Sequence, residues 1–205
     1  MIGKIVGMSD RSASASDQLR FLFYELNLLT EGRKLVWLVL FFEASAGVLL
    51  SYRLDRLGYL LTGRSWRILR VLFWPLFLVF RILGCRHDIC YTAEIGPGLR
   101  VMHPVLGVVV NGNAIIGKNC LLNGGNSIGI RRPIKHGELV LGDNVQLGVN
   151  ACILGPVKVG NQVSVGAGAV VITDLPDNVV AVGIPARFKP LDATSSRADD
   201  AGGYL

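Results

Sequence analysis

Residues 141–155 read LGDNVQLGVNACILG, and in this stretch an aliphatic residue returns at every sixth position. Leu141 and Leu147 are each followed by glycine, and a small or aliphatic residue, Val145 or Ala151, lies four positions after each of them. A helix would drift out of phase with a six-residue period, and a flat sheet would alternate every two residues without a fixed glycine. We therefore predict a parallel β-helix, built from six-residue units of one short strand and one turn.

The period extends over most of the second half of the chain. Its aliphatic positions are Ile95, Val101, Val110, Ile116, Leu122, Ile128, Leu141, Leu147, Ile153, Val159, Val165 and Val171. One such side chain per unit should point inward, so that neighbouring coils bury a continuous core. The glycine or asparagine that follows most of them should supply the unusual backbone angles of the turn. Cys120 and Cys152 fall within this pattern and are predicted to be small buried hydrophobic residues.

The period is interrupted twice, and each interruption contains a histidine. Val110 comes nine positions after Val101, and Leu141 comes thirteen positions after Ile128, instead of six. A solenoid expels additional residues as loops, and loops on a rigid scaffold often carry the functional site. His103 in the first interruption and His136 in the second are therefore candidate site residues.

Composition divides the 205 residues into two unlike halves. Residues 1–92 contain 14 of the 16 aromatic residues, whereas residues 93–205 contain 18 of the 25 glycines. We predict an α+β protein with a helical domain at 1–92, a β-helix at 93–189 and a flexible tail at 190–205. A content of 51% hydrophobic and 18% charged residues excludes a wholly disordered chain. Four cysteines without paired spacing exclude a small disulfide scaffold.

Three helical segments are predicted in the first half. The first begins near Asp17, which would cap it, because leucines recur there at three- and four-residue steps. The second, Leu35–Tyr52, is nearly all apolar, is interrupted by Glu43 and is followed by Arg53, Asp55 and Arg56. The third, Ser65–Gly84, has only ten uncharged residues in a row, which is too few to span a bilayer of ~30 Å.

Two interpretations of these helices remain open. Their apolar faces would pack on one another and on a neighbouring subunit, or they would attach peripherally to a membrane. The second interpretation rests on arginines that surround apolar residues: Arg64, Arg67, Arg70, Arg81 and Arg86. Residues 1–15 lack the apolar core of a signal peptide, so a cytoplasmic location is expected under either interpretation.

No metal or nucleic-acid site is expected. The segment Cys85–Cys90 contains metal-ligand residue types but has no second pair to complete a tetrahedral site, so we interpret it as a link between domains. The net charge of +6 is interleaved with a core pattern rather than gathered into a stripe.

The repeats resemble those of the hexapeptide-repeat acyltransferases, in particular the serine acetyltransferases and their relatives in polysaccharide gene clusters. The stretches that carry the resemblance are 103–111, 141–155, 165–170 and 183–187. The resemblance implies a left-handed β-helix, a homotrimer or a dimer of trimers, and acetyl-CoA as co-substrate in the grooves between adjacent chains.

The same resemblance assigns roles to residues. His103 matches the catalytic histidine, a general base that would take the proton from an acceptor hydroxyl. The oxyanion would be stabilised by backbone N–H groups near Gly124–Gly129. His136 corresponds only loosely to a second histidine of the family, because Gly137 rather than proline follows it, so an active-site role and a solvated role both remain open.

Acetyl-CoA contacts are implied for residues in the matched segments and just beyond them. These are Gly129, Gly148, Ala151, Gly166, Ala167, Arg187 and Lys189. Small residues would let the pantetheine arm lie against the coil, and the two cations would reach the phosphates. The second interruption also contains Arg131, Arg132 and Lys135. These cations would either bind CoA phosphates or an anionic acceptor, or be solvated.

We expect O-acetylation of a small-molecule or sugar hydroxyl. The family has an acid before the catalytic histidine, suited to the ammonium group of serine, whereas this chain has Met102. The alternatives are a true serine O-acetyltransferase of cysteine biosynthesis, a non-catalytic trimeric scaffold, and a zinc protein resembling the γ-class carbonic anhydrases.

Overall fold

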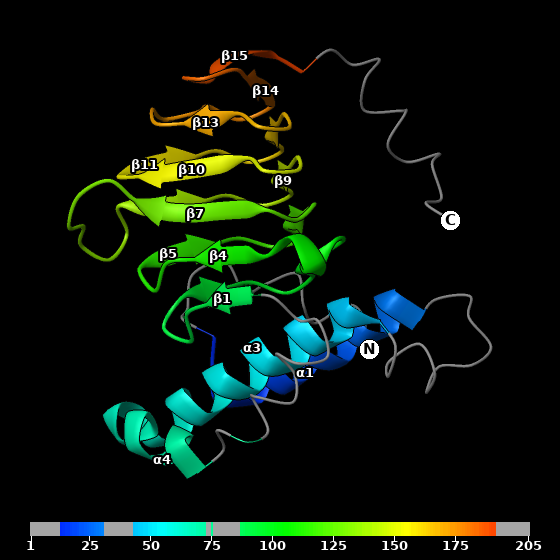
Figure 1. The fold of residues 1–205 in the computed structure, drawn as a ribbon, viewed down its shortest axis with the longest axis vertical. Helices are drawn as coiled ribbons and strands as arrows, with labels where there is room; N and C mark the ends of the chain where they lie inside the picture. The colour runs from blue at the N-terminus through cyan, green and yellow to red at the C-terminus, as the bar shows by residue number, and fades with distance from the viewer. Residues whose placement is uncertain (1–12, 31–42, 73–74, 76–86, 192–205) are drawn as a thin grey trace.

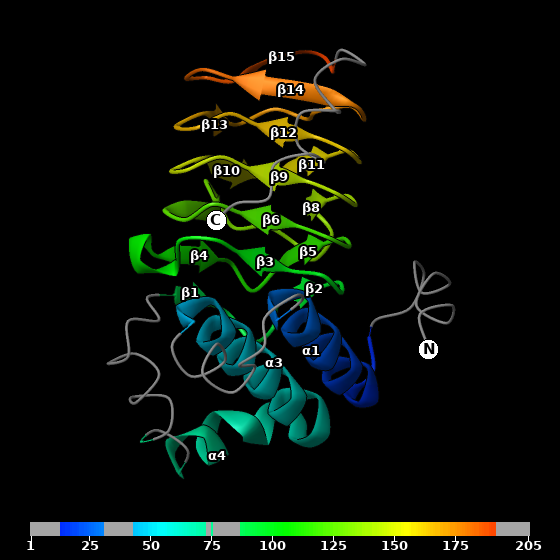
Figure 2. The same ribbon diagram turned by 90° about the vertical axis from the view of Figure 1, so that its right-hand side faces the viewer.

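The computed structural model describes residues 13–30, 43–72, 75 and 87–191. Helices α1 (Ala15–Thr30), α3 (Ala44–Thr62) and α4 (Trp66–Leu72) precede a stack of short strands. A 3-10 turn, η2 (Gly63–Ser65), joins α3 to α4. Helices α1 and α3 lie across the lower end of the stack, and the strands rise above them in coils (Figures 1 and 2).

The coils contribute their strands to three sheets, in which all neighbouring strands are parallel except β14 and β15. The first sheet contains β1 (His87–Ile89), β4 (Val108–Val110), β7 (Asn126–Ile130), β10 (Cys152–Gly155) and β13 (Val170–Val171). The second contains β2 (Glu94–Ile95), β5 (Ala114–Ile116), β8 (Leu139–Leu141) and β11 (Val157–Val159). The third contains β3 (Arg100–Val101), β6 (Leu121–Leu122), β9 (Gln146–Leu147), β12 (Ser164–Val165), β14 (Val179–Val182) and β15 (Arg187–Pro190).

The pairing confirms a parallel β-helix and shows where its described part begins and ends. Among the named strands, β15 alone runs antiparallel to its neighbour, β14, at the upper end of the third sheet. Strand β1 pairs with β4, so the coil already includes residues 87–89. The coil therefore starts before the boundary that composition predicts at residue 92. Composition does not reveal β1, because this His-Asp-Ile strand lacks the glycines of the later coils.

Side-chain burial confirms the six-residue period. The twelve aliphatic positions from Ile95 to Val171 are between 0 and 4% exposed. Cys120 is fully buried, and burial raises the pKa of its thiol to about 12. Cys152 is half-buried, because it directly precedes the inward-facing Ile153 in β10. The prediction that Cys152 is a core residue was therefore wrong.

The unusual backbone angles fall two positions later than expected. Positive φ angles occur three residues after the inward aliphatic residue, for example at Asn119, Asn144 and Gly168. The glycine directly after the aliphatic residue has another purpose. A Cβ atom on Gly142 would lie 2.8 Å from the backbone oxygen of Gly160 in the next coil. This position is therefore glycine because neighbouring coils approach closely there.

Two glycines, one packed closely against the next coil and one with a positive φ angle, give a matched pair of variants. Gly142→Ala should lower the free energy of unfolding by about 1–3 kcal/mol, because the added methyl group meets backbone that cannot easily move. Gly168→Asn should change it by less than about 0.5 kcal/mol, since the position opens to free space and asparagine occupies equivalent turns. Urea denaturation measures both, and equal losses would contradict this account.

The helices confirm the predicted elements, but their ends and charges differ from expectation. Helix α1 begins at Ala15, and Asp17 accepts hydrogen bonds from the N–H (3.0 Å) and hydroxyl (2.6 Å) of Ser14 just before the helix. Helix α3 continues to Thr62, so Arg53, Asp55 and Arg56 lie within it, each less than 5% exposed. None of the described helices is both long and apolar enough to cross a bilayer.

Several sequence expectations lie outside the described residues. They are the apolar run from Leu35 to Phe42, most of the third segment after Leu72, Arg81, Cys85, Arg86 and the tail from residue 192.

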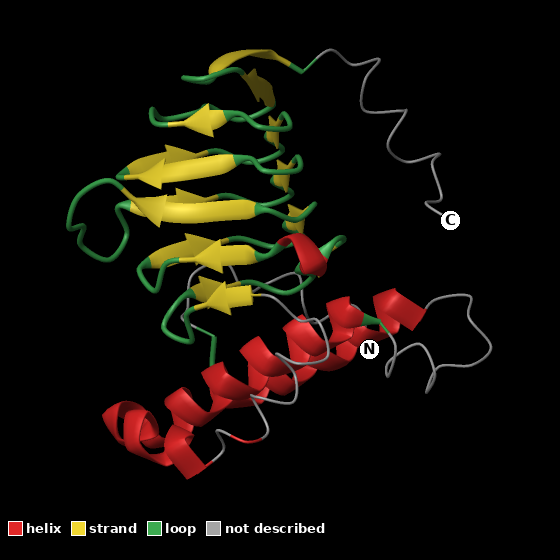
Figure 3. Ribbon diagram, viewed as in Figure 1, coloured by secondary structure: helices red, strands yellow, loops and turns green. Residues whose placement is uncertain are grey.

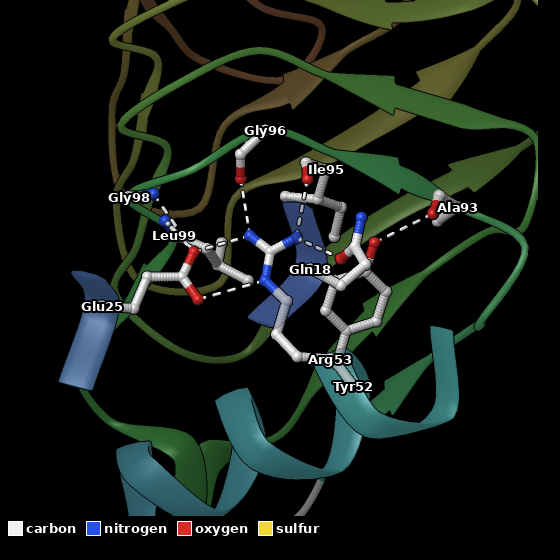
Figure 4. A network of polar contacts seen from close by, with 9 residues as sticks. All are labelled: Gln18, Glu25, Tyr52, Arg53, Ala93, Ile95, Gly96, Gly98 and Leu99. Atoms are coloured by element: carbon white, nitrogen blue, oxygen red, sulfur yellow. Dashed lines mark hydrogen bonds and ion pairs between the residues drawn. The ribbon is translucent and has the colours of Figure 1, made fainter. Parts of the chain in front are cut away.

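A buried ion pair joins the helices to the first coil (Figure 4). Arg53 on α3 pairs with Glu25 on α1, with an Nη2–Oε1 distance of 2.6 Å and side chains that are at most 1% exposed. The guanidinium also donates to the carbonyl oxygens of Ile95 and Gly96, at 2.8 and 2.6 Å. The Glu25 carboxylate accepts the N–H groups of Gly98 and Leu99.

Apolar and hydroxyl contacts extend this junction. Leu22, Leu49 and Tyr52 belong to the same buried cluster as the inward residues of the coil. The Tyr52 hydroxyl donates to the carbonyl of Ala93 at 2.9 Å. The Ser45 hydroxyl donates to the carbonyl of Val101 at 2.6 Å. The helices and the coil therefore share one core, and α3 holds the strand that leads to His103.

Candidate active site

His103 lies at the corner where the chain leaves the third sheet for the first. Strand β3 ends at Val101, and the additional residues of the first interruption form a short 3-10 turn, η3 (Pro104–Leu106), seen as the small red helix beside the coil in Figure 3. The His103 side chain is exposed and makes no hydrogen bond to any residue that the structure describes. Its imidazole is therefore available to a substrate, as a proton-transfer role requires.

Small residues stack above His103 at the same corner of successive coils. A Cβ atom on Gly124 would lie 3.1 Å from the Cβ of His103. The Gly124 carbonyl accepts the N–H of Asn150 in the next coil, and a Cβ on Gly148 would lie 2.5 Å from the N of Ala167 in the coil after that. We call Gly124, Gly148, Gly166 and Ala167 the corner column. With coils ~4.8 Å apart, it rises roughly 14 Å above His103.

The other residues implied in acetyl-CoA binding are placed differently. Ala151 is 0% exposed and faces the core, so its side chain cannot reach a ligand. Gly129 lies in β7 on the first sheet, beside Leu154 of β10. Arg187 and Lys189 are exposed on β15, in the uppermost strand of Figure 1.

The second interruption forms a loop at a different corner. It leaves the coil after β7, on the side opposite to η3 (Figure 1). His136 in this loop is exposed, and the loop lies on the other side of the coil from η3, the turn that directly follows His103. Arg131 donates to the carbonyls of Leu154 and Ile172, so its guanidinium is tied to the coil.

Two of the backbone amides expected to stabilise an oxyanion are already engaged. The Gly124 N–H donates to the side-chain oxygen of Asn126 at 2.9 Å. The Gly125 N–H donates to the carbonyl of Gly107 at 2.6 Å. These two amides therefore stabilise the turn itself. The sequence pattern did not reveal this, because one acceptor depends on the orientation of the Asn126 side chain and the other is a carbonyl of another coil.

A groove of about 500 Å³ lies elsewhere, between α1 and the corner that joins the second and third sheets. Its lining includes Gln18, Arg56, Glu94 and Lys118. It contains none of the residues implied in catalysis or acetyl-CoA binding. Across the described part of the chain, no three His, Cys, Asp or Glu side chains converge to hold a metal ion.

Comparison with known proteins agrees with this architecture. Residues 139–173 match the family model described as bacterial transferase hexapeptide (six repeats). The putative colanic acid biosynthesis acetyltransferase WcaB of Escherichia coli K12 is 37% identical over 118 residues, which are 56% of this chain and 72% of WcaB. The serine acetyltransferase of Synechococcus elongatus is 36% identical over 96 residues. That match covers 46% of this chain but only 39% of the relative.

Solved structures extend the likeness to the helices. The serine acetyltransferase of Neisseria gonorrhoeae superposes with a TM-score of 0.69 at 26% identity, over 93% of this chain and 71% of that one. The solenoid is thus a left-handed parallel β-helix preceded by helices, the architecture of a class of acyl-group transferases. This chain belongs to the hexapeptide-repeat acyltransferase family, in the branch that includes the serine acetyltransferases and WcaB.

Proposed function

We propose that this protein transfers an acetyl group from acetyl-CoA to a hydroxyl group of a sugar or other small acceptor, with His103 as general base. The observation that carries the proposal is the exposed His103 imidazole, which has no hydrogen-bond partner among the described residues and lies below the corner column. The names of the relatives, which include serine and colanic acid acetyltransferases, support the same chemistry.

The proposed reaction needs one proton acceptor and no covalent enzyme intermediate. His103 would take the proton of the acceptor hydroxyl while that oxygen attacks the thioester carbonyl of acetyl-CoA. Collapse of the tetrahedral intermediate would break the carbon–sulfur bond, and the imidazolium would return the proton to the departing thiolate. Imidazole suits both steps because it exchanges protons near neutral pH.

The corner column is the proposed path of the pantetheine arm. Gly124, Gly148, Gly166 and Ala167 present little side-chain volume along three successive coils. Arg187 and Lys189 lie exposed on the last coil and are the proposed phosphate contacts. The buried Ala151 side chain takes no part in this arrangement.

We propose that the assembled enzyme is a homotrimer in which a second chain covers this corner. The loop at residues 131–138 lies at another corner of the coil, so His136 would approach His103 only from a neighbouring chain. In that arrangement His136 would help to orient the acceptor.

Met102 decides our choice of acceptor. It lies between Val101 and His103, and a thioether cannot pair with an ammonium group. A neutral sugar hydroxyl therefore suits the site better than free serine does. The match to WcaB, named for colanic acid biosynthesis, supports a sugar acceptor. Serine remains the second candidate, because the Neisseria gonorrhoeae relative has also been solved in complex with serine.

An acceptor panel tests the proposal. Purified full-length protein is mixed with acetyl-CoA and a thiol-detecting reagent, and the release of CoA is followed with serine, nucleotide sugars or oligosaccharides. We expect acceptor-dependent release with a sugar and little above the acceptor-free rate with serine. Fastest release with serine would overturn the choice of acceptor. A lack of acceptor-dependent release across the whole panel would count against the activity itself.

A further inference from the structure

Helix α4 is held to α3 by contacts on one of its faces. Trp66 is 8% exposed, and its indole N–H donates to Asp55 Oδ1 at 2.6 Å. Arg70, one turn further along α4, forms an ion pair of 2.9 Å with the other oxygen of Asp55. The Trp66 ring also occupies the space that a side chain at Gly58 would need. These contacts fix the rotation of α4 about its own axis.

With that rotation fixed, the opposite face of α4 is apolar and points away from the protein. Ile68, Val71 and Leu72 are 77%, 70% and 75% exposed. Their spacing of three and four residues places them on a single stripe of the helix, opposite Trp66. We call these three residues the α4 face. Isolated exposed apolar residues are ordinary, but a stripe of this kind on an anchored helix marks an interaction site.

The charges beside the α4 face are of one sign. Arg67 flanks the stripe on α4, and Arg64 precedes it in η2; both are exposed. From residue 56 to residue 87 the sequence contains six arginines and no aspartate or glutamate. An apolar stripe bordered by arginine is the pattern of a helix that lies in the interface of an anionic bilayer, with the apolar face inserted and the guanidinium groups at the phosphates.

We propose that the α4 face docks on the surface of a membrane that contains anionic lipid. The position of α4 fits this role, since it lies at the end of the molecule away from β15, and the coil would extend from the membrane rather than lie flat on it (Figure 1). In this arrangement α4 lies in the bilayer interface, so the proposed contact is peripheral.

Vesicle flotation with the full-length protein tests the proposal. We expect wild-type protein to float with vesicles of phosphatidylglycerol and phosphatidylcholine in equal parts, more weakly with phosphatidylcholine alone, and more weakly at high salt. The double variant Ile68→Ser/Leu72→Ser should bind about tenfold less or weaker, because it removes the inserted surface. Arg64→Ala and Arg67→Ala should each weaken binding about fivefold, and only where anionic lipid is present.

Phe188→Ser is the matched control. Phe188 is an exposed apolar side chain between two basic residues, at the opposite end of the coil. Its loss should leave flotation unchanged. The arginine variants decide the question if the double variant fails to fold, which circular dichroism would reveal.

Two results would overturn the proposal. One is wild-type protein that fails to float with anionic vesicles, and the other is flotation that the α4 variants leave unchanged. In the first case, a change of oligomeric mass in the Ile68→Ser/Leu72→Ser variant would assign the α4 face to a second copy of the chain. Acetyl transfer to a soluble acceptor does not enter the test, so its outcome is independent of the proposed enzymatic function.

Discussion

Replacing His103 with alanine should reduce kcat for acetyl transfer by about 10²–10⁴-fold, the usual contribution of a general base. The variant would still present the corner column to acetyl-CoA, so the KM for the donor should change little. The fold should also survive, since the side chain is exposed and makes no hydrogen bond to any described residue. The measurement is the CoA-release rate on the best acceptor of the panel, together with a thermal melt.

A neighbouring variant controls for local disturbance. Val105 lies two residues away in η3 and is 64% exposed. Val105→Ala should alter the same turn without removing a proton acceptor, so its kcat should stay close to wild type. If His103→Ala retained the wild-type rate on the true acceptor, the proposed mechanism would be wrong even with the fold intact.

Replacing Arg53 with methionine should lower the free energy of unfolding by about 3–5 kcal/mol. The change leaves the Glu25 carboxylate buried without its counter-charge and deprives the carbonyls of Ile95 and Gly96 of their donors. The loss arises mainly from the stranded charge rather than from the attraction itself. Glu25→Leu combined with Arg53→Met should therefore recover part of the stability, though not all of it, because the Gly98 and Leu99 amides lose their acceptor.

A surface ion pair supplies the control. Arg20 and Asp17 approach to 3.7 Å with the Arg20 side chain 72% exposed, so Arg20→Met should cost less than about 1 kcal/mol. Chemical denaturation of all variants at one protein concentration makes the comparison, because subunit association would otherwise shift the midpoint. An Arg53→Met protein as stable as Arg20→Met would show that the buried pair does not hold the helices to the coil.

The period of six predicted the inward residues of the coil because it is a local property of the chain. Each inward aliphatic position is set by the repeat itself, and the two interruptions appear as surface features, η3 and the loop at residues 131–138. The first interruption likewise predicted that His103 lies where additional residues leave the coil, which in the structure is η3.

What the pattern missed depends on contacts between segments far apart in the chain. The charges of Arg53, Asp55 and Arg56 suggested the end of a buried segment, yet their partners on α1, α4 and the first coil make burial possible. The hydrogen bonds of the Gly124 and Gly125 amides likewise form only when the turn and the neighbouring coil are in place. In most units that have a left-handed residue, that residue is an asparagine or glycine three positions after the aliphatic residue, and Gln162 is an exception.

The antiparallel strand β15 has a consequence for how the protein behaves at high concentration. A stack of parallel strands offers unpaired N–H and C=O groups at its two ends, which invites further molecules to add on and grow a fibre. Here α1 and α3 close the lower end, and the reversed chain of β15 occupies the upper edge of the third sheet. Deleting residues from β15 onward should accordingly expose the upper edge alone, and because the helices still close the lower end, size-exclusion chromatography should show molecules that pair through this edge rather than grow into a fibre.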